Sequence, residues 1–142
     1  MNWKKFFISL FVVFAILEIS GYLIHMIFLK NEYLTETFKA VFRPHDQLAA
    51  NMWMLWITDL IWSFFFVLIY LKGFRTKGLI DAVKYGFYIG IFCGFVNAYK
   101  TYALCPFPYL IIFYWFILAM FQSLILGIVL WWLYRKEPVK SK

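Results

Sequence analysis

Four long runs of apolar residues divide the chain, and short polar segments separate each run from the next. The runs cover residues 6–29, 49–71, 82–104 and 109–134. A helix needs about 20 mostly apolar residues to cross the hydrocarbon core of a membrane, so every run is long enough. Trp and Tyr cluster near several ends of these runs, as they do at bilayer interfaces. The pattern predicts one all-α integral membrane domain over 1–142, built as a four-helix transmembrane bundle.

The connections between the predicted spans differ in length. The first outer connection, residues 30–48, is the only extended one. Four of its apolar side chains recur at helical spacing: Leu34, Phe38, Val41 and Phe42. That spacing predicts a short amphipathic segment on the outer membrane surface, either a spacer or a lid over an outward-opening cavity. The second outer connection, at Pro106 and Pro108, is a tight turn that makes the third and fourth helices antiparallel neighbours.

Composition and charge exclude most soluble classes and add an orientation. Of the 142 residues, 65% are hydrophobic and 15% are charged, whereas a soluble domain carries about 25% charged residues. The net charge of +7 arises from cations that gather on one side of the predicted bundle. Ten lie there: Lys4, Lys5, Lys72, Arg75, Lys77, Lys84, Arg135, Lys136, Lys140 and Lys142. The positive-inside rule then predicts that both termini, with the basic tail 135–142, are cytoplasmic.

Two series of small residues occur in the last two spans. The third span carries Ala82, Gly86, Gly90, Gly94 and Ala98, and the fourth carries Ala119, Ser123 and Gly127. Small residues at four-residue spacing let two helix backbones approach closely in lipid, where helix association depends on dispersion contacts. The two series predict a tightly packed antiparallel pair. The alternative is that one series meets a second copy of the chain or a larger membrane protein.

A few ionisable groups interrupt the spans, and such groups are by default functional hypotheses. Counted from the outer helix ends at about 1.5 Å per residue, Glu18 and Asp59 lie at the same depth, near mid-bilayer. Gln122 lies slightly deeper. Two carboxyl groups in a low dielectric repel each other and resist ionisation. They predict a site for a proton or a cation, and the alternative is that a protonated Glu18 only hydrogen-bonds neighbouring helices together.

Further polar residues lie on helix faces that we expect to turn inward beside this pair. The candidate cavity-lining residues are Tyr22, His25, Asn97, Lys100 and Thr101. Bulky apolar residues below Gln122 would close such a cavity, so it would open outward. A haem held by two histidines would need a second membrane histidine, and His45 lies in a connection. We predict no cofactor and no metal site, because no ligand spacing supports one.

Together these features predict a small membrane protein that transports a small solute, coupled to a proton or a cation. One alternative is an accessory or assembly subunit of a larger membrane complex. Another is a small membrane redox subunit or enzyme that uses His25. The sequence has no nucleophile elbow, phosphate loop or HExxH helix, which disfavours an enzyme. The expected partners are membrane lipids, with a homodimer or a larger membrane partner open, and nucleic acid is not expected.

Two resemblances add to these predictions. The run Glu18-Ile-Ser-Gly21 in the first of four spans resembles the small multidrug resistance transporters. In that family a first-helix glutamate exchanges protons for cationic drugs, so the resemblance implies proton exchange at Glu18. The chain differs from the family in its long first outer connection, in its third span, which lacks the family's tryptophan, and in the additional carboxyl group of Asp59.

The layout of the whole chain is similar to small bacterial inner-membrane proteins with four spans, a group with no assigned activity. The residues that carry this resemblance are Glu18, His25, Tyr33, Arg43, Pro44, Gly86, Gly90 and the segment Tyr102–Pro108. The resemblance implies the four-span fold and a bacterial inner membrane, and it implies no particular chemistry.

Overall fold

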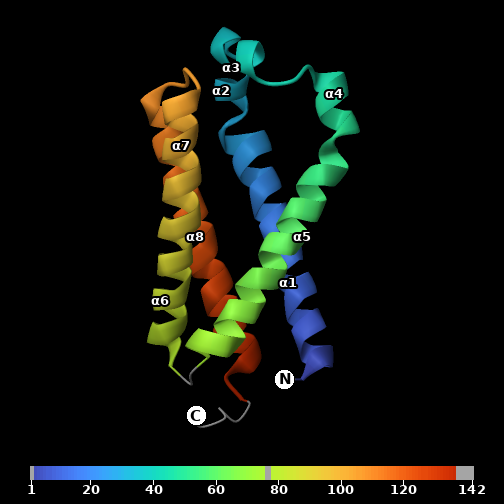
Figure 1. Ribbon diagram of the computed structural model, residues 1–142, viewed down its shortest axis with the longest axis vertical. Coiled ribbons are helices and arrows are strands. Elements are labelled where there is room, and N and C mark those ends of the chain that lie inside the picture. The colour runs from blue at the N-terminus through green and yellow to red at the C-terminus, as the bar shows by residue number, and fades with distance from the viewer. Residues whose placement is uncertain (1, 76–77, 137–142) are drawn as a thin grey trace.

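The computed structural model describes residues 2–75 and 78–136 of the chain. It is 88% helical and has no strand within that part of the sequence. Four helices are long and apolar enough to cross a membrane: Trp3–Phe28, Met52–Phe74, Leu79–Leu104 and Tyr109–Tyr134. They stand side by side as a bundle (Figure 1). The chain is therefore a small multi-pass membrane protein with the predicted all-α, four-helix fold.

Three of the spans contain a π-helical stretch, which the apolar pattern does not predict. The first span is α1 (Trp3–Tyr22) followed by a π-helix at Leu23–Phe28, and the second is α5 (Met52–Ile69) followed by one at Tyr70–Phe74. The third is α6 (Leu79–Ile89) and α7 (Val96–Leu104), joined by a π-helix at Gly90–Phe95, and the fourth is α8 (Tyr109–Tyr134). A π-helical turn is rare and frequently accompanies a functional site.

The helix ends follow from local chemistry. Asn2 caps α1, since its side-chain oxygen accepts a hydrogen bond from the Lys5 amide at 3.2 Å. At the loop end of the third span, α7 ends at Leu104, and the cap residue Cys105 has the extended backbone that a following proline favours. Pro108 then precedes the first residue of α8. The turn between these helices is therefore as tight as predicted.

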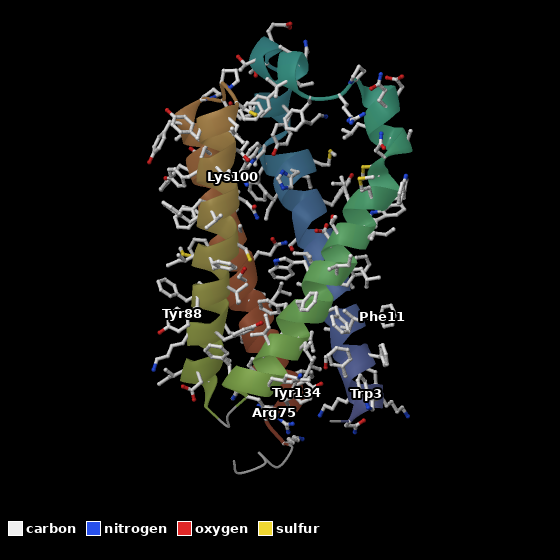
Figure 2. The ribbon with its side chains drawn as sticks, viewed as in Figure 1. Trp3, Phe11, Arg75, Tyr88, Lys100 and Tyr134 are labelled. Atoms are coloured by element: carbon white, nitrogen blue, oxygen red, sulfur yellow. The ribbon has the colours of Figure 1, made fainter. Side chains whose placement is uncertain are left out.

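The two ends of the bundle are distinguished by what they carry. Trp3, Arg75 and Tyr134 lie at one end, called here the terminal end (Figure 2). The opposite end, called the loop end, carries the first long connection (Figure 1). The described part of the basic tail is Arg135 and Lys136. Its remainder, and Lys77 in the connection at the terminal end, lie outside the described residues.

The long connection folds as three short helices, α2 (Lys30–Tyr33), α3 (Glu36–Val41) and α4 (His45–Ala50). The predicted amphipathic segment corresponds to α3 and its flanks. Phe38 is 1% exposed and its ring stacks on Phe107 at a centroid separation of 4.5 Å, whereas Leu34 is 58% exposed. The segment therefore docks on the bundle through one face.

The spans pack as two pairs. α1 packs along α5, and α6, α7 and their π-helical junction pack along α8. α1 also contacts α8, which joins the pairs. Near the terminal end, the π-helical stretch of the second span reaches α6, while the opposite half of α5 leans away from α7 (Figure 1). The second span therefore diverges from α7 and α8 toward the loop end, whereas the first span stays beside α8 (Figure 1).

Two apolar clusters lie at different heights in the bundle. One contains Phe6, Val13, Phe66, Val67, Tyr70, Ala82, Tyr85, Leu126, Leu130 and Tyr134. The other contains Leu29, Phe38, Ala98, Phe107, Ile111 and Ile112. The first joins all four spans near the terminal end, and the second joins the long connection to the loop end of α7 and α8. Glu18, Asp59 and Gln122 lie in the spans between the residues of these two clusters.

Candidate functional site: a cavity between the four spans

A cavity of about 390 Å³ lies between the two apolar clusters, and all four spans contribute to its wall. Its lining residues are Leu17, Gly21, Ile24, His25, Asp59, Trp62, Cys93, Gly94, Asn97, Ala98, Thr101, Trp115, Leu118, Ala119, Gln122 and Ser123. The volume falls within the range of pockets that hold small molecules. Two of the three π-helical stretches, Leu23–Phe28 and Gly90–Phe95, supply lining residues.

The carboxyl groups of Glu18 and Asp59 meet beside this cavity. Asp59 lines it, and the Glu18 carboxyl group lies close enough to that of Asp59 for the two to interact, although Glu18 itself is not part of the wall. The Glu18 Oε1 atom is buried and has no hydrogen-bond partner among the described residues. The equal depth inferred from the sequence thus corresponds to an approach of α1 to α5 at these two residues.

Gln122 lies in the cavity wall but bonds to α1 rather than to Glu18. Its Nε2 donates to the Leu17 carbonyl at 3.1 Å and to the Ser20 hydroxyl at 2.5 Å. Ser20 in turn donates to the Ile16 carbonyl at 2.6 Å. The amide of Gln122 therefore ties α8 to α1 at the height of the carboxyl pair. Ser20 could not be selected as a site residue from the sequence, because a serine that bonds its own helix leaves no pattern.

His25 lies against Tyr33, a residue of the long connection. Its Nδ1 lies 2.5 Å from the Tyr33 hydroxyl, and the Trp115 Nε1 donates to the same hydroxyl at 2.9 Å. Burial raises the pKa of Tyr33 to about 12, although the hydrogen bond from Trp115 acts in the opposite direction. His25 and Trp115 both line the cavity, so Tyr33 bonds to two parts of its wall.

α7 contributes Asn97 and Thr101, which share one helix face, to the lining. The Thr101 hydroxyl donates to the Asn97 carbonyl at 2.8 Å, which leaves its oxygen lone pairs available. Two tryptophans add aromatic surface to the wall, Trp62 from α5 and Trp115 from α8. The wall therefore combines one carboxyl group, amide and hydroxyl groups, an imidazole and two indoles.

The predicted lining residues Tyr22 and Lys100 are not part of this wall. Tyr22 is 64% exposed, and Lys100 is exposed on α7 near the loop end (Figure 2). The inward face of the first span runs through Leu17 and Gly21, so the next residue turns outward. A lysine near a helix end reaches the headgroup region with its long side chain and need not face inward.

The small-residue series of the third and fourth spans face each other. A Cβ added at Gly86 would lie 2.5 Å from the Ser123 carbonyl oxygen, and one at Gly127 would lie 2.6 Å from that of Ala82. At Gly90 the nearest atom is the Met120 Cα at 3.0 Å. At Gly94 it is the Ala119 Cβ at 3.2 Å. The backbones of the third and fourth spans are therefore closest at Gly86 and Gly127, and the distance between them increases toward the cavity.

Gly21 differs from these glycines. A Cβ at this position would meet nothing within 4 Å, and the residue lines the cavity. Gly73 also has nothing within 4 Å, but it lies near the terminal end and outside the cavity wall. Gly21 therefore faces open space inside the bundle, which makes it a position where the cavity can be filled by substitution.

In residues 2–75 and 78–136, no three His, Cys, Asp or Glu side chains gather as ligands of one metal ion would. Comparisons of the chain with models of protein families, with curated proteins and with solved structures found no match. The function is therefore inferred from the chemistry of the cavity and of the groups around it.

Proposed function

We propose that this protein transports a small cation or protonated amine through the cavity, in exchange for a proton carried by the Glu18–Asp59 pair. The observation that carries the proposal is the interaction of Glu18 with a second carboxyl group, that of Asp59, which lines a cavity within the spans. Charged groups at this depth are expensive and are typical of ion and proton pathways.

Exchange follows from the electrostatics of the pair. Two carboxylates in contact in a low dielectric repel each other, so the pair retains a proton while the cavity holds only neutral groups. A cation that enters the cavity supplies the compensating charge, and the proton can then leave. The cation and the proton compete for the same two carboxyl groups, which couples the binding of one to the release of the other.

The remaining lining residues fit a small organic cation. The faces of Trp62 and Trp115 attract positive charge, and Asn97 and Thr101 offer oxygen acceptors to an ammonium group. The division of the spans into the α1–α5 pair and the α6–α7–α8 group supports a carrier, since the cavity lies where these two units meet.

We also propose that the terminal end is cytoplasmic and that the membrane is a bacterial inner membrane. The cations of the described chain at the terminal end support this orientation. They are Lys4, Lys5, Lys72, Arg75, Lys84, Arg135 and Lys136. Reporter fusions at Gly78 and at Asp46 test it, because a cytoplasmic terminal end requires that they report opposite sides, with Gly78 inside.

Proton release from lipid vesicles tests the transport proposal. The purified protein is reconstituted with a pH-sensitive dye trapped in an acidic lumen, and sodium, potassium or ethanolamine is added outside at constant osmolarity. We expect at least one of these probes to raise the lumenal pH faster than in protein-free vesicles. The variants Glu18→Gln and Asp59→Asn should abolish this difference.

Gly73→Leu is the matched control, because the added side chain lies outside the cavity wall. A folded wild-type protein that releases no protons with any of the three probes would contradict the proposal. Full proton release by Glu18→Gln and Asp59→Asn would contradict the role of the carboxyl pair, even if transport itself is observed.

A further inference from the structure

Tyr33 connects the long connection to two different walls of the cavity. It belongs to α2, outside the spans, yet its hydroxyl lies 2.5 Å from the His25 Nδ1 and accepts a hydrogen bond from Trp115 at 2.9 Å. These partners belong to the first and the fourth span. A single phenol thus joins the connection, α8 and the π-helical part of the first span.

One hydrogen-bond direction at this hydroxyl is determined by its chemistry. The indole N–H of Trp115 can only donate, so Tyr33 accepts there. The hydroxyl proton of Tyr33 remains available for the His25 Nδ1 when the neutral imidazole carries its own proton on Nε2, and with the other tautomer Nδ1–H donates to Tyr33. In either tautomer the phenol oxygen joins His25 to Trp115.

Aromatic rings hold the same segment in place on the loop-end side. Tyr33 meets Phe38 edge-on at 5.2 Å, and Phe38 stacks on Phe107 at 4.5 Å. Phe42 stacks on Phe107 as well, at 5.6 Å. Phe107 meets Trp115 edge-on at 5.6 Å, which closes the set of rings against a residue of the cavity wall.

We propose that Tyr33 is the latch of a gate formed by α2 and α3, which closes the loop end of the cavity. The apolar contacts of Phe38 hold the gate on the bundle, and the Tyr33 hydroxyl fixes its position over His25 and Trp115. When both hydrogen bonds of this hydroxyl break, α2 can separate from His25 and Trp115 of the cavity wall while α3 stays attached through its rings. Tyr33 is thus a positioning residue that controls access.

The gate concerns the same cavity as the proposed transport, but it does not depend on which solute enters or on whether a proton is exchanged. A spacer would require only that the connection span the distance between α1 and α5. It would not require a phenol that bonds to two spans at once, and it would not couple the connection to the reactivity of residues inside the cavity.

Cys93 provides a reporter inside the cavity. It lines the wall and its thiol is free, and the second thiol, Cys105, lies at the loop-end turn. In a Cys105→Ser background, the rate at which a charged methanethiosulfonate modifies Cys93 measures access to the cavity in lipid nanodiscs. We expect Tyr33→Phe to raise this rate about fivefold, the change expected when one neutral hydrogen bond is removed from the closed form.

Tyr22→Phe is the matched control, since it makes the same chemical change on an exposed side chain outside the wall, and its rate should equal that of the parent. Trp115→Phe removes the other hydrogen bond of the Tyr33 hydroxyl and should also raise the rate. The melting temperature of each variant establishes that it is folded. If Tyr33→Phe does not fold, the Cys93 modification rate of Trp115→Phe is the test of the latch.

An unchanged Cys93 rate in a folded Tyr33→Phe protein would overturn the latch, and so would an equal increase in Tyr22→Phe. These measurements use no transported solute. The gate can therefore be rejected while proton exchange is observed, and it can be supported in a protein that releases no protons from vesicles.

Discussion

Gly86 of α6 lies so close to Ser123 of α8 that a methyl group at Gly86 would stand 2.5 Å from the Ser123 carbonyl oxygen. The obstacle is backbone within a helix, which cannot move aside as a flexible side chain can. We therefore expect Gly86→Ala to destabilise the protein by about 1–3 kcal/mol, the usual cost of overpacking. The melting temperature in detergent measures this loss.

Two other glycines serve as controls for this prediction. At Gly94 the nearest atom to an added Cβ is a side-chain methyl group at 3.2 Å, so Gly94→Ala should cost less than Gly86→Ala. At Gly21 an added methyl group meets nothing, and Gly21→Ala should raise stability by up to about 1 kcal/mol through helix propensity. Equal melting temperatures for all three variants would mean that the α6–α8 contact is not as close as described.

Filling the cavity from Gly21 should block it. Gly21→Leu places a large side chain among Asp59, Asn97 and Gln122 without a clash at its Cβ. We expect a folded protein that has lost proton release in the vesicle assay and whose Cys93 is modified more slowly in the Cys105→Ser background. Gly73→Leu should change neither property. Undiminished proton release by Gly21→Leu would argue that solutes do not pass through this cavity.

The hydrogen bond between Gln122 and Ser20 should be measurable as a coupling between two spans. Ser20→Ala and Gln122→Met each remove one partner, and the double variant removes both. In a double-mutant cycle we expect a coupling energy of about 1 kcal/mol, the typical net value of a neutral hydrogen bond. Strictly additive losses of stability would show that the amide is held by the Leu17 carbonyl alone.

Stability should fall at alkaline pH because of Tyr33. Burial raises the pKa of its phenol from 10.0 to about 12, so the folded protein holds this proton more tightly than the unfolded chain. The resulting stabilisation is complete below pH 10 and is lost as the pH rises toward 12. The melting temperature of the wild type should therefore fall more steeply over this range than that of Tyr33→Phe. Parallel curves would contradict the burial of the phenol, and Tyr22→Phe should follow the wild type.

The four spans could be predicted from the sequence because every helix that crosses the lipid needs a run of apolar residues of sufficient length. The facing of Gly86 and Gly127 was also accessible, because small residues at four-residue spacing mark close helix contacts. The tight turn with Pro106 and Pro108 then left only an antiparallel arrangement for these two helices. Each of these signals is local and repeats along the chain.

The cavity was only partly predictable. Asp59, Gln122, His25, Asn97 and Thr101 line it, because a polar side chain within a span avoids lipid by turning inward. This argument fails near the ends of the spans, where water is close. Lys100 is polar and lies outside the wall for that reason.

Tyr33 could not be selected as a site residue from the sequence. It lies outside the spans, where a tyrosine is an ordinary interfacial residue, and its partners are eight and 82 positions away along the chain. Its role depends on the way that α2 folds back against the bundle. The π-helical stretches were missed as well, since a change in the backbone hydrogen-bond step leaves the composition of a span unaltered.

Those stretches have a consequence for the phase of the helices. Each α-helical residue advances the side-chain direction by about 100°, and a π-helical turn accommodates one additional residue before the same direction returns. The stretch Gly90–Phe95 therefore resets the angular register between α6 and α7. Removing one residue from this stretch would let it close as an ordinary α-helical turn, so Asn97 and Thr101 would still face the cavity while Gly86 stayed against α8. A one-residue deletion here should therefore preserve both the cavity and the bundle, whereas the same deletion within α6 would rotate the residues that follow it by about 100°.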